Sequence, residues 1–255
     1  MSGPPDPLQT VDADLSRIRQ QFQGLGDPER AVQEKRYLKS PFSFYGVAVP
    51  QIRAIARQLR RERKHISKEA LWSLCWALWQ GGCHEERALA MLLLAEYRSL
   101  LDHTDMPSLE KMLRESVNWD QVDEISVHLV GSILQKDSRV LEYLKAWSVD
   151  NSFWMRRIAL LSQLLLFRAG TGDRELFYSF ARDMMEEREF FIRKAIGWVL
   201  RELARVEPEE VFRFVVENRA RMSGVTFREA TRRLPPHLQA QLGTGPKGGP
   251  LALPG

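Results

Sequence analysis

The chain has 255 residues, and its 44% hydrophobic content is enough for a sizeable buried core, which excludes disorder of the whole chain. Its 37 basic and 33 acidic side chains leave a net charge of +4 and a pI near 9.2, which mildly favours an anionic partner such as nucleic acid. The only two cysteines, Cys75 and Cys83, exclude a disulfide framework, and the scattered histidines argue against a metal site.

The chain reads as a series of short helices between two tails. Residues 1–7 contain three prolines and no secretory pattern, so we expect a flexible N-terminus and a reducing, cytoplasmic location. No run of about 18 apolar residues occurs, so we expect no membrane span. Apolar spacing of three and four predicts an all-α chain, with helices near 8–23, 28–38, 50–61, 68–80, 85–99, 109–116, 120–135, 138–148, 153–168, 174–187, 189–205, 208–220 and 226–233.

These helices are expected to form a single domain over residues 8–242, and the Gly- and Pro-rich residues 243–255 are expected to be a disordered tail. Several helix starts carry local signals: Ser67 and Asp173 as caps, and Pro50 and Pro208 in first turns. Three tryptophans at helical spacing, Trp72, Trp76 and Trp79, predict core packing.

Four charged residues recur near helix starts in similar small, apolar surroundings, at Arg87, Asp123, Arg157 and Lys194. Their separations are 36, 34 and 37 residues, which is typical of HEAT-type helix pairs. In such a stack the second helix of every pair lines one face. The sequence therefore predicts a solenoid whose basic, tryptophan-bearing concave face holds these charges in a row and binds DNA.

The loop at residues 39–49 follows one predicted helix and leads into another. It contains Phe42 and Phe44, which either bind a ligand or cap the first helices. Free backbone amides at the following helix start, with Arg53 nearby, predict a phosphate contact.

Trp119 and Asp123 are four residues apart at the start of a predicted helix, so they share one helical face. Asp120 is placed to cap this helix or to interact with its dipole. Two interpretations remain open. Trp119 is a core residue and Asp123 pairs with an arginine of a neighbouring helix, or an exposed ring and carboxylate meet a cationic or polar ligand.

Two later helices mix aromatic and basic residues. Arg156 and Arg157 follow Trp154, and because adjacent residues do not share a helical face, at most one of the two arginines faces a ligand. Lys194, Trp198 and Arg201 lie along one stripe, as in a groove that takes anions and bases. The alternative is that Trp198 is core and that Gly197 permits close helix packing.

Six segments in this order resemble the AlkD-type DNA alkylation repair family, over about residues 30 to 233. They are Lys35-Arg36-Tyr37-Leu38-Lys39, the loop Gly46–Pro50, Glu85-Glu86-Arg87-Ala88, Trp119-Asp120-Gln121-Val122-Asp123, Trp154-Met155-Arg156-Arg157 and Phe190–Trp198. The residue before Trp119 is Asn118, where we expect relatives to carry an aromatic side chain.

The resemblance implies a right-handed superhelix of HEAT-like repeats that acts as a DNA glycosylase on N3- and N7-alkylated purines, without base flipping. It assigns the catalytic carboxylate to Asp123 and the lesion-side aromatic rings to Tyr37, Trp119 and Trp198. It assigns the contact with the DNA backbone to Arg157, with Arg156 as its rival. The implied partner is duplex DNA that carries alkylated bases, and neither a metal nor another cofactor is implied.

The implied chemistry fits these residue types, because an alkylated purine already carries a positive charge and leaves without a strong general acid. A carboxylate near the sugar stabilises the developing oxocarbenium ion. The alternative readings are a DNA-structure-binding protein without activity and a protein-interaction scaffold. We expect DNA contacts from Arg53, Arg87, Lys194 and Arg201, and a monomer.

Overall fold

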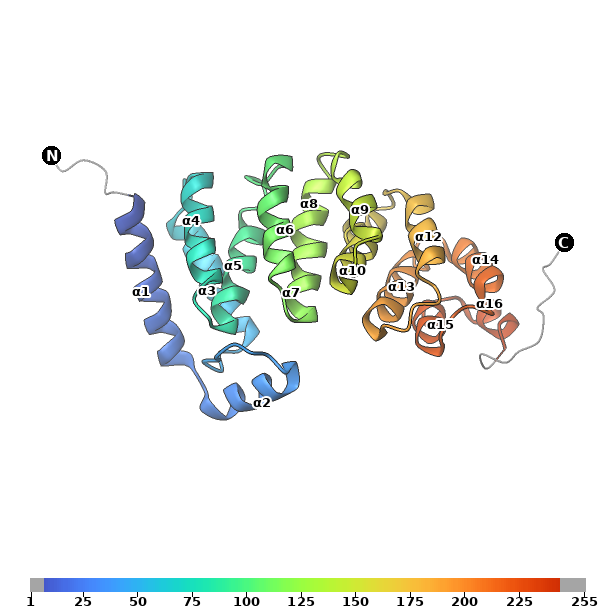
Figure 1. Cartoon of the computed structure of the whole chain (residues 1–255), viewed down its shortest axis with the longest axis horizontal. Helices are drawn as coiled ribbons and strands as arrows, with labels where there is room; N and C mark the ends of the chain where they lie inside the picture. The colour runs from blue at the N-terminus through green and yellow to red at the C-terminus, as the bar shows by residue number, and fades with distance from the viewer. Residues whose placement is uncertain (1–6, 244–255) are drawn as a thin grey trace. The chain divides into compact units, whose positions relative to one another are not determined.

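The computed structural model describes residues 7–243 and is all-helical, as predicted (Figure 1). Within this range no strand forms, and the one isolated β-bridge joins Ser43 to Cys83. The chain divides into two compact units, residues 1–125 and 126–255. The prediction of a single domain over residues 8–242 stays a prediction. The flexible tails predicted for 1–7 and 243–255 lie, apart from Pro7 and Gly243, outside the described residues.

In unit 1, α5 packs on α3, α4 and α7, and α1 packs on α4, which is the stacking of helix pairs expected from the repeat. Its helices are α1 (Pro7–Leu25), α2 (Pro28–Leu38), α3 (Val49–Glu62), α4 (Lys68–Trp79), α5 (His84–Glu96), the short 3₁₀ turn η1 (His103–Asp105), α6 (Met106–Arg114) and α7 (Trp119–Glu124).

Unit 2 stacks its helices in the same way. They are α8 (Gly131–Leu134), α9 (Val140–Ser148), α10 (Phe153–Leu161), α11 (Leu164–Arg168), α12 (Arg174–Asp183), α13 (Phe190–Leu203), α14 (Pro208–Asn218), α15 (Gly224–Thr231) and α16 (Pro236–Gln241). The π-helix η2 (Ile125–Val130) connects α7 to α8 along the chain. None of the helices in residues 7–243 is long and apolar enough to cross a bilayer.

The helix starts that carry local sequence signals are confirmed. Ser67 accepts a hydrogen bond from the Ala70 amide at the start of α4, and Asp173 accepts one from Leu176 at the start of α12. Proline occupies the first turns of α3 and α14, where its missing N–H leaves no hydrogen bond unmade.

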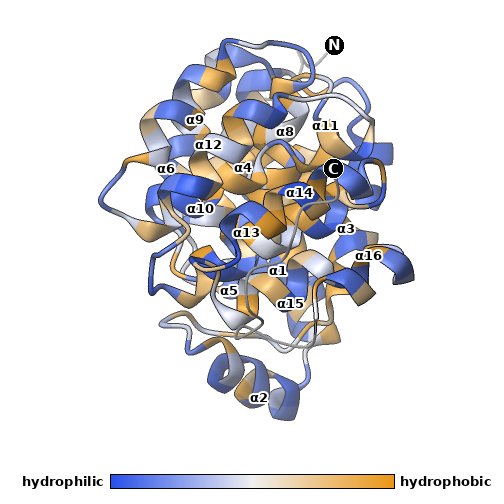
Figure 2. Ribbon diagram, turned by 90° about the vertical axis from the view of Figure 1, so that its right-hand side faces the viewer, coloured by the Kyte–Doolittle hydropathy of each residue, from blue (hydrophilic) through white to orange (hydrophobic). Residues whose placement is uncertain are grey.

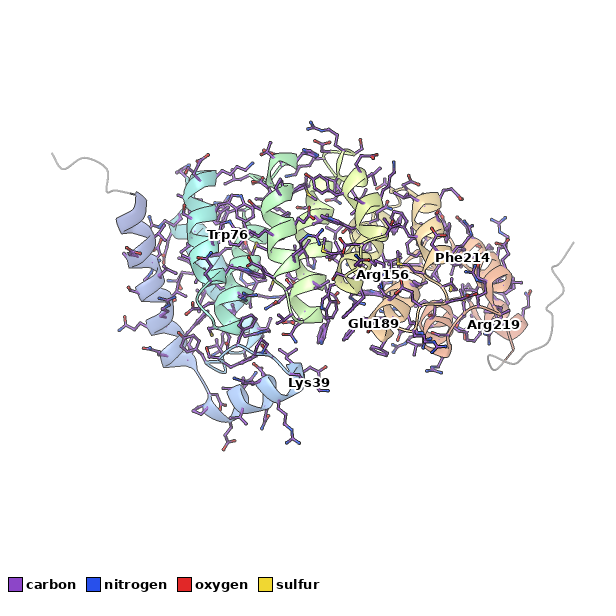
Figure 3. The ribbon with its side chains drawn as sticks, viewed as in Figure 1. Lys39, Trp76, Arg156, Glu189, Phe214 and Arg219 are labelled. Carbon is purple, nitrogen blue, oxygen red and sulfur yellow. The ribbon has the colours of Figure 1, made fainter. Side chains whose placement is uncertain are left out.

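The tryptophan stripe of α4 packs inside unit 1, as predicted. Trp79 is fully buried and donates its indole N–H to Glu115, and Trp72 donates to the buried Asp105. Trp76 is half-buried and lies on the α6 side of α4, with the Lys111 ammonium 4.9 Å from its ring centre (Figure 3). The stripe therefore joins neighbouring helices rather than forming a binding platform.

Two predicted helices are not continuous. The helix expected at 120–135 contains the π-helix η2, and the one expected at 153–168 breaks between α10 and α11 at Ser162 and Gln163. The Gln163 side chain accepts a hydrogen bond from the Asp173 amide and donates one to the Asp173 carbonyl. These two bonds tie Gln163 to the start of α12. The sequence also missed α16. Apolar spacing does not reveal such breaks, because both parts keep the same buried face.

Gly197 brings α13 against α15 in unit 2. A Cβ at this position would lie 2.6 Å from the Glu229 Cβ and 2.9 Å from the Thr226 carbonyl oxygen. These distances are too short for any side chain. The prediction that Gly197 permits close packing of two helices is therefore confirmed. The approach fixes where Glu229 of α15 meets the basic face of α13.

We predict that Gly197→Ala lowers the free energy of unfolding by about 1–3 kcal/mol, because α15 must move away from α13. The matched control is Gly24→Ala near the end of α1, where an added Cβ meets nothing within 4 Å. This control should be neutral or stabilising by up to about 1 kcal/mol. Urea unfolding followed by circular dichroism measures both, and equal effects of the two substitutions would contradict the prediction.

Candidate functional site

Trp119 opens α7 with its ring at the surface. Its preceding residue, Asn118, is the extended N-cap, and 37% of Trp119 is exposed. Asp123 follows one turn later and is half-buried. The structure therefore places an exposed ring and a half-buried carboxylate on one short helix, and the role of this pair stays a prediction.

Asn118 connects α7 to α2. Its side-chain amide donates a 2.6 Å hydrogen bond to the Leu38 carbonyl at the end of α2. The preceding residue, Tyr37, is 74% exposed. Leu38 follows Tyr37 in the chain, and Asn118 precedes Trp119. The bond between Leu38 and Asn118 therefore places Tyr37 and Trp119 in the same part of unit 1.

Helix α2 itself has unusually little packing. It buries none of its side chains, and its surface is mostly hydrophilic (Figure 2). It begins at Asp27, whose carboxylate accepts from the Glu29 and Arg30 amides, and ends at Lys39 with φ of 50°. Local capping and the bond from Asn118 thus hold a helix whose exposed residues include Lys35, Arg36 and Tyr37.

Asp120 has a different role from Asp123. Its carboxylate lies 2.9 Å from Nε2 of His84 at the start of α5, and the Phe44 ring stacks on His84 at 4.6 Å. Asp120 lies in the first turn of α7, where a negative charge interacts favourably with the helix dipole, as one of its two predicted roles requires. It does not cap the helix, because Asn118 is the N-cap and the Asp120 carboxylate is directed to α5. It joins the first turns of α5 and α7.

The loop before α3 does not offer the free amides that we expected for a phosphate. Glu85, which is buried at the start of α5, accepts hydrogen bonds from the Gly46 and Val47 amides at 2.7 and 3.2 Å. The Ala48 amide donates to the side chain of Gln51. An internal carboxylate thus already occupies the anion position that these amides form.

Arg87 has an internal role, unlike the DNA contact that we expected. It is buried between the rings of Phe42 and Trp79, 4.0 and 4.3 Å from their centres. Its guanidinium donates to the carbonyls of Trp79 and Glu115. Burial lowers the pKa of Arg87, but an arginine remains protonated at neutral pH. Arg53, in contrast, is exposed on α3.

In unit 2 both candidate arginines of α10 hold the segment that leads into α13. Arg156 forms a two-pronged ion pair with Glu187, with both distances 2.8 Å, and extends from α10 toward the start of α13 (Figure 3). Arg157 is 3% exposed and donates to the Phe191 carbonyl. Both therefore make internal contacts, and Arg157 is the more enclosed of the two.

The stripe on α13 contains an acid that the sequence did not reveal. Glu229 of α15 accepts hydrogen bonds from both Lys194 and Arg201, on either side of the half-buried Trp198. Burial alone would raise the pKa of Glu229, but the hydrogen bond from Lys194 and the charge of Arg201 hold that pKa below its usual value. The stripe therefore has one net positive charge.

The described parts of the two units thus carry different chemistry. Unit 1 presents aromatic rings beside the carboxylate of Asp123, and unit 2 presents Trp198 among cations. Within residues 7–243, no three His, Cys, Asp or Glu side chains come together as metal ligands. Cys75 and Cys83 are buried free thiols, and burial raises the pKa of Cys83 to about 12, so this thiol stays protonated at neutral pH.

Comparison with known proteins places this arrangement in a family. The model of the family described as DNA alkylation repair enzyme matches residues 18–234. A structure described as a predicted DNA alkylation repair enzyme from Enterococcus faecalis is 26% identical, with a TM-score of 0.75 over 83% of this chain and 97% of that chain.

A protein structure from Streptococcus mutans UA159 is similar in fold, with 14% identity and a TM-score of 0.55 over 73% of this chain and 93% of that chain. No curated protein sequence matches the chain significantly.

We predict that Glu85→Ala destabilises the protein by about 2–4 kcal/mol, because it leaves the Gly46 and Val47 amides without their acceptor in a buried place. Glu85→Gln keeps one acceptor oxygen, so its free energy of unfolding should fall by less than that of Glu85→Ala. The control is Glu96→Ala at the exposed end of α5, with a change below about 0.5 kcal/mol. Thermal unfolding measures the series, and a Glu85→Ala protein as stable as the control would disprove the role of Glu85.

Proposed function

The chain belongs to the DNA alkylation repair enzyme family, and we propose that it is a DNA glycosylase that removes cationic N3- and N7-alkylated purines from duplex DNA. The observation that carries this proposal is the pairing on α7 of the exposed Trp119 ring with Asp123, next to the helix that bears Tyr37. A carboxylate one helical turn from an exposed aromatic ring suits a cationic reacting centre and is poorly suited to hold a phosphate.

In the proposed reaction the bond between C1′ of the deoxyribose and the purine nitrogen breaks. Both bonding electrons go to the purine, which neutralises its positive charge and makes it a good leaving group. Positive charge then develops on the sugar, and Asp123 stabilises it. The same carboxylate orients a water molecule, which adds its hydroxyl to C1′ and releases one proton, so that an abasic site and a neutral alkylpurine result.

Aromatic side chains contribute to the same charge balance. Trp119 and Trp198 would place the negative faces of their rings against the nucleotide, with about 0.5–2 kcal/mol from each contact. Tyr37, on the weakly packed α2, would contact the strand beside the lesion. We propose that the base stays stacked in the duplex and is not flipped into a pocket.

Cations of the described surface would hold the DNA backbone. We propose this role for Arg53, which is exposed, for Lys194, whose side chain is 40% exposed, and for the more enclosed Arg201. Arg156 and Arg157 would act mainly by holding the start of α13, given their bonds to Glu187 and to the Phe191 carbonyl. Arg87 would stabilise α5 from inside. We further propose that the protein acts as a monomer in the cytoplasm.

We predict that the wild type releases 7-methylguanine from a duplex oligonucleotide with one such base, and that Asp123→Asn is slower by about 10²- to 10³-fold. Alkaline cleavage of the abasic product, followed by gel electrophoresis, measures the single-turnover rate. The control is Glu124→Gln on the same helix, which removes a neighbouring half-buried carboxylate and should stay within about threefold of the wild type.

Two results would change this view. A wild type that binds the duplex tightly but releases no base would make the protein a DNA-structure-binding protein without activity. An Asp123→Asn variant as fast as the wild type would remove Asp123 from the reaction.

We predict that activity depends on the charge of the lesion. A duplex with the neutral base 8-oxoguanine should give no product under conditions that consume the 7-methylguanine duplex, because a neutral purine needs a general acid to leave and the proposal contains none. The two substrates are compared in the same assay at pH 7.5. Equal rates would show that an acid assists the leaving group.

A further inference from the structure

Four arginines surround one buried carboxylate in unit 2. Glu202, in the last turn of α13, is 5% exposed. Its oxygens lie 3.2 Å from Arg168, 3.4 Å from Arg233, 3.5 Å from Arg205 and 3.9 Å from Arg201. We call these five residues the Glu202 cluster.

The members of the cluster come from three different helix ends. Arg168 is the last residue of α11, Arg205 follows α13, and Arg233 follows α15. The C-terminal end of a helix carries a partial charge of about −0.5, so the three ends together offset about 1.5 of the positive charges. Arg201 also pairs with Glu229, which holds Lys194, so five cations meet two carboxylates here and about 1.5 positive charges remain after the helix ends are counted.

The same cluster has many unused hydrogen-bond donors. Each guanidinium offers five N–H groups, whereas a carboxylate accepts about four hydrogen bonds in all. The side chains of Arg168, Arg205 and Arg233 are 39%, 50% and 38% exposed, so their remaining N–H groups face solvent. Glu202 therefore positions three guanidinium forks at the surface without neutralising them. A phosphodiester, with two free oxygens, matches such forks.

The cluster continues the stripe described on α13. Arg201 contacts both Glu229, which also holds Lys194, and Glu202. Arg205 follows Trp198 by seven residues, which is about 10 Å along a helix. That distance corresponds to about three nucleotides along the axis of duplex DNA. A DNA phosphate held at the cluster would thus lie a few nucleotides from the nucleotide that Trp198 contacts.

We propose that Arg168, Arg205 and Arg233 form a phosphate-binding patch for undamaged duplex DNA flanking the modified nucleotide. This inference rests on the proposed function, which supplies the duplex. The patch adds affinity that does not depend on the lesion, because phosphates carry no sequence or damage information. It accounts for arginines that neither the repeat pattern nor the candidate reaction uses.

The test compares three triple variants of the full chain. Arg168→Gln/Arg205→Gln/Arg233→Gln removes the patch, and Arg168→Lys/Arg205→Lys/Arg233→Lys keeps its charge. The matched control changes three arginines of the same unit outside the cluster and removes the same charge: Arg139→Gln/Arg213→Gln/Arg221→Gln. Binding of an undamaged 20-base-pair duplex is measured by fluorescence anisotropy from about 50 to 200 mM salt.

The slope of log K against log salt concentration is negative, and each phosphate contact contributes about −0.9 to it. We expect the glutamine variant to make this slope less steep by up to about 2.7. Its affinity at 50 mM salt should fall at least tenfold more than that of the control. The lysine variant should keep a slope close to that of the wild type. A glutamine variant whose slope equals that of the control would overturn the proposal.

Two further measurements keep the result decisive. If the glutamine triple variant does not fold, as judged by circular dichroism, Arg205→Gln alone is used, and a slope change near 0.9 is expected. The wild type is also assayed for 7-methylguanine release. No release together with a less steep slope in the variant would reject the glycosylase and keep the patch, whereas release together with an unchanged slope would reject only the patch.

Discussion

Several buried backbone groups at or near helix ends in this protein are satisfied by side chains of other helices, most of them charged. A helix end leaves amides or carbonyls without partners, and these must be hydrogen-bonded when they are removed from water. Glu85 accepts from the loop before α3, and Arg87 donates to carbonyls after α4 and α6. Asn118 and Arg157 donate to the carbonyls of Leu38 and Phe191. The positions of Tyr37 and Trp119, and of the start of α13, all depend on these bonds.

This constraint explains why several charges near the candidate site do not face solvent. In a stack of helix pairs, the loops at one edge meet the starts of neighbouring helices, so a charge placed there meets backbone groups first. The repeat that positions Arg87, Asp123, Arg157 and Lys194 in equivalent places therefore does not give them equivalent roles. Arg87 and Arg157 are enclosed, whereas Lys194 is partly exposed and bonded to Glu229.

The sequence predicted what is local and missed what is distant. Helix starts at Ser67 and Asp173 follow from contacts within three residues, so the residue types alone identify them. The exposure of Trp119 depends on a bond between residues 80 positions apart, and the occupation of the loop amides depends on Glu85, 39 positions from Gly46. Glu229 could not be assigned to Lys194 for the same reason, since the close approach at Gly197 decides it.

The two acids on the basic side of α13 have consequences for how tightly DNA is held. Glu229 forms ion pairs with Lys194 and Arg201. A phosphate that binds either cation must compete with the Glu229 carboxylate for it. Glu202 lies close to four arginines, whose guanidinium groups together offer far more N–H donors than one carboxylate can accept. Cations beside Trp198 should therefore bind phosphate weakly and exchange it readily, while those at the end of α13 bind it more firmly. In the proposed glycosylase, this order would let the protein hold a duplex and still move its reactive surface from one nucleotide to the next.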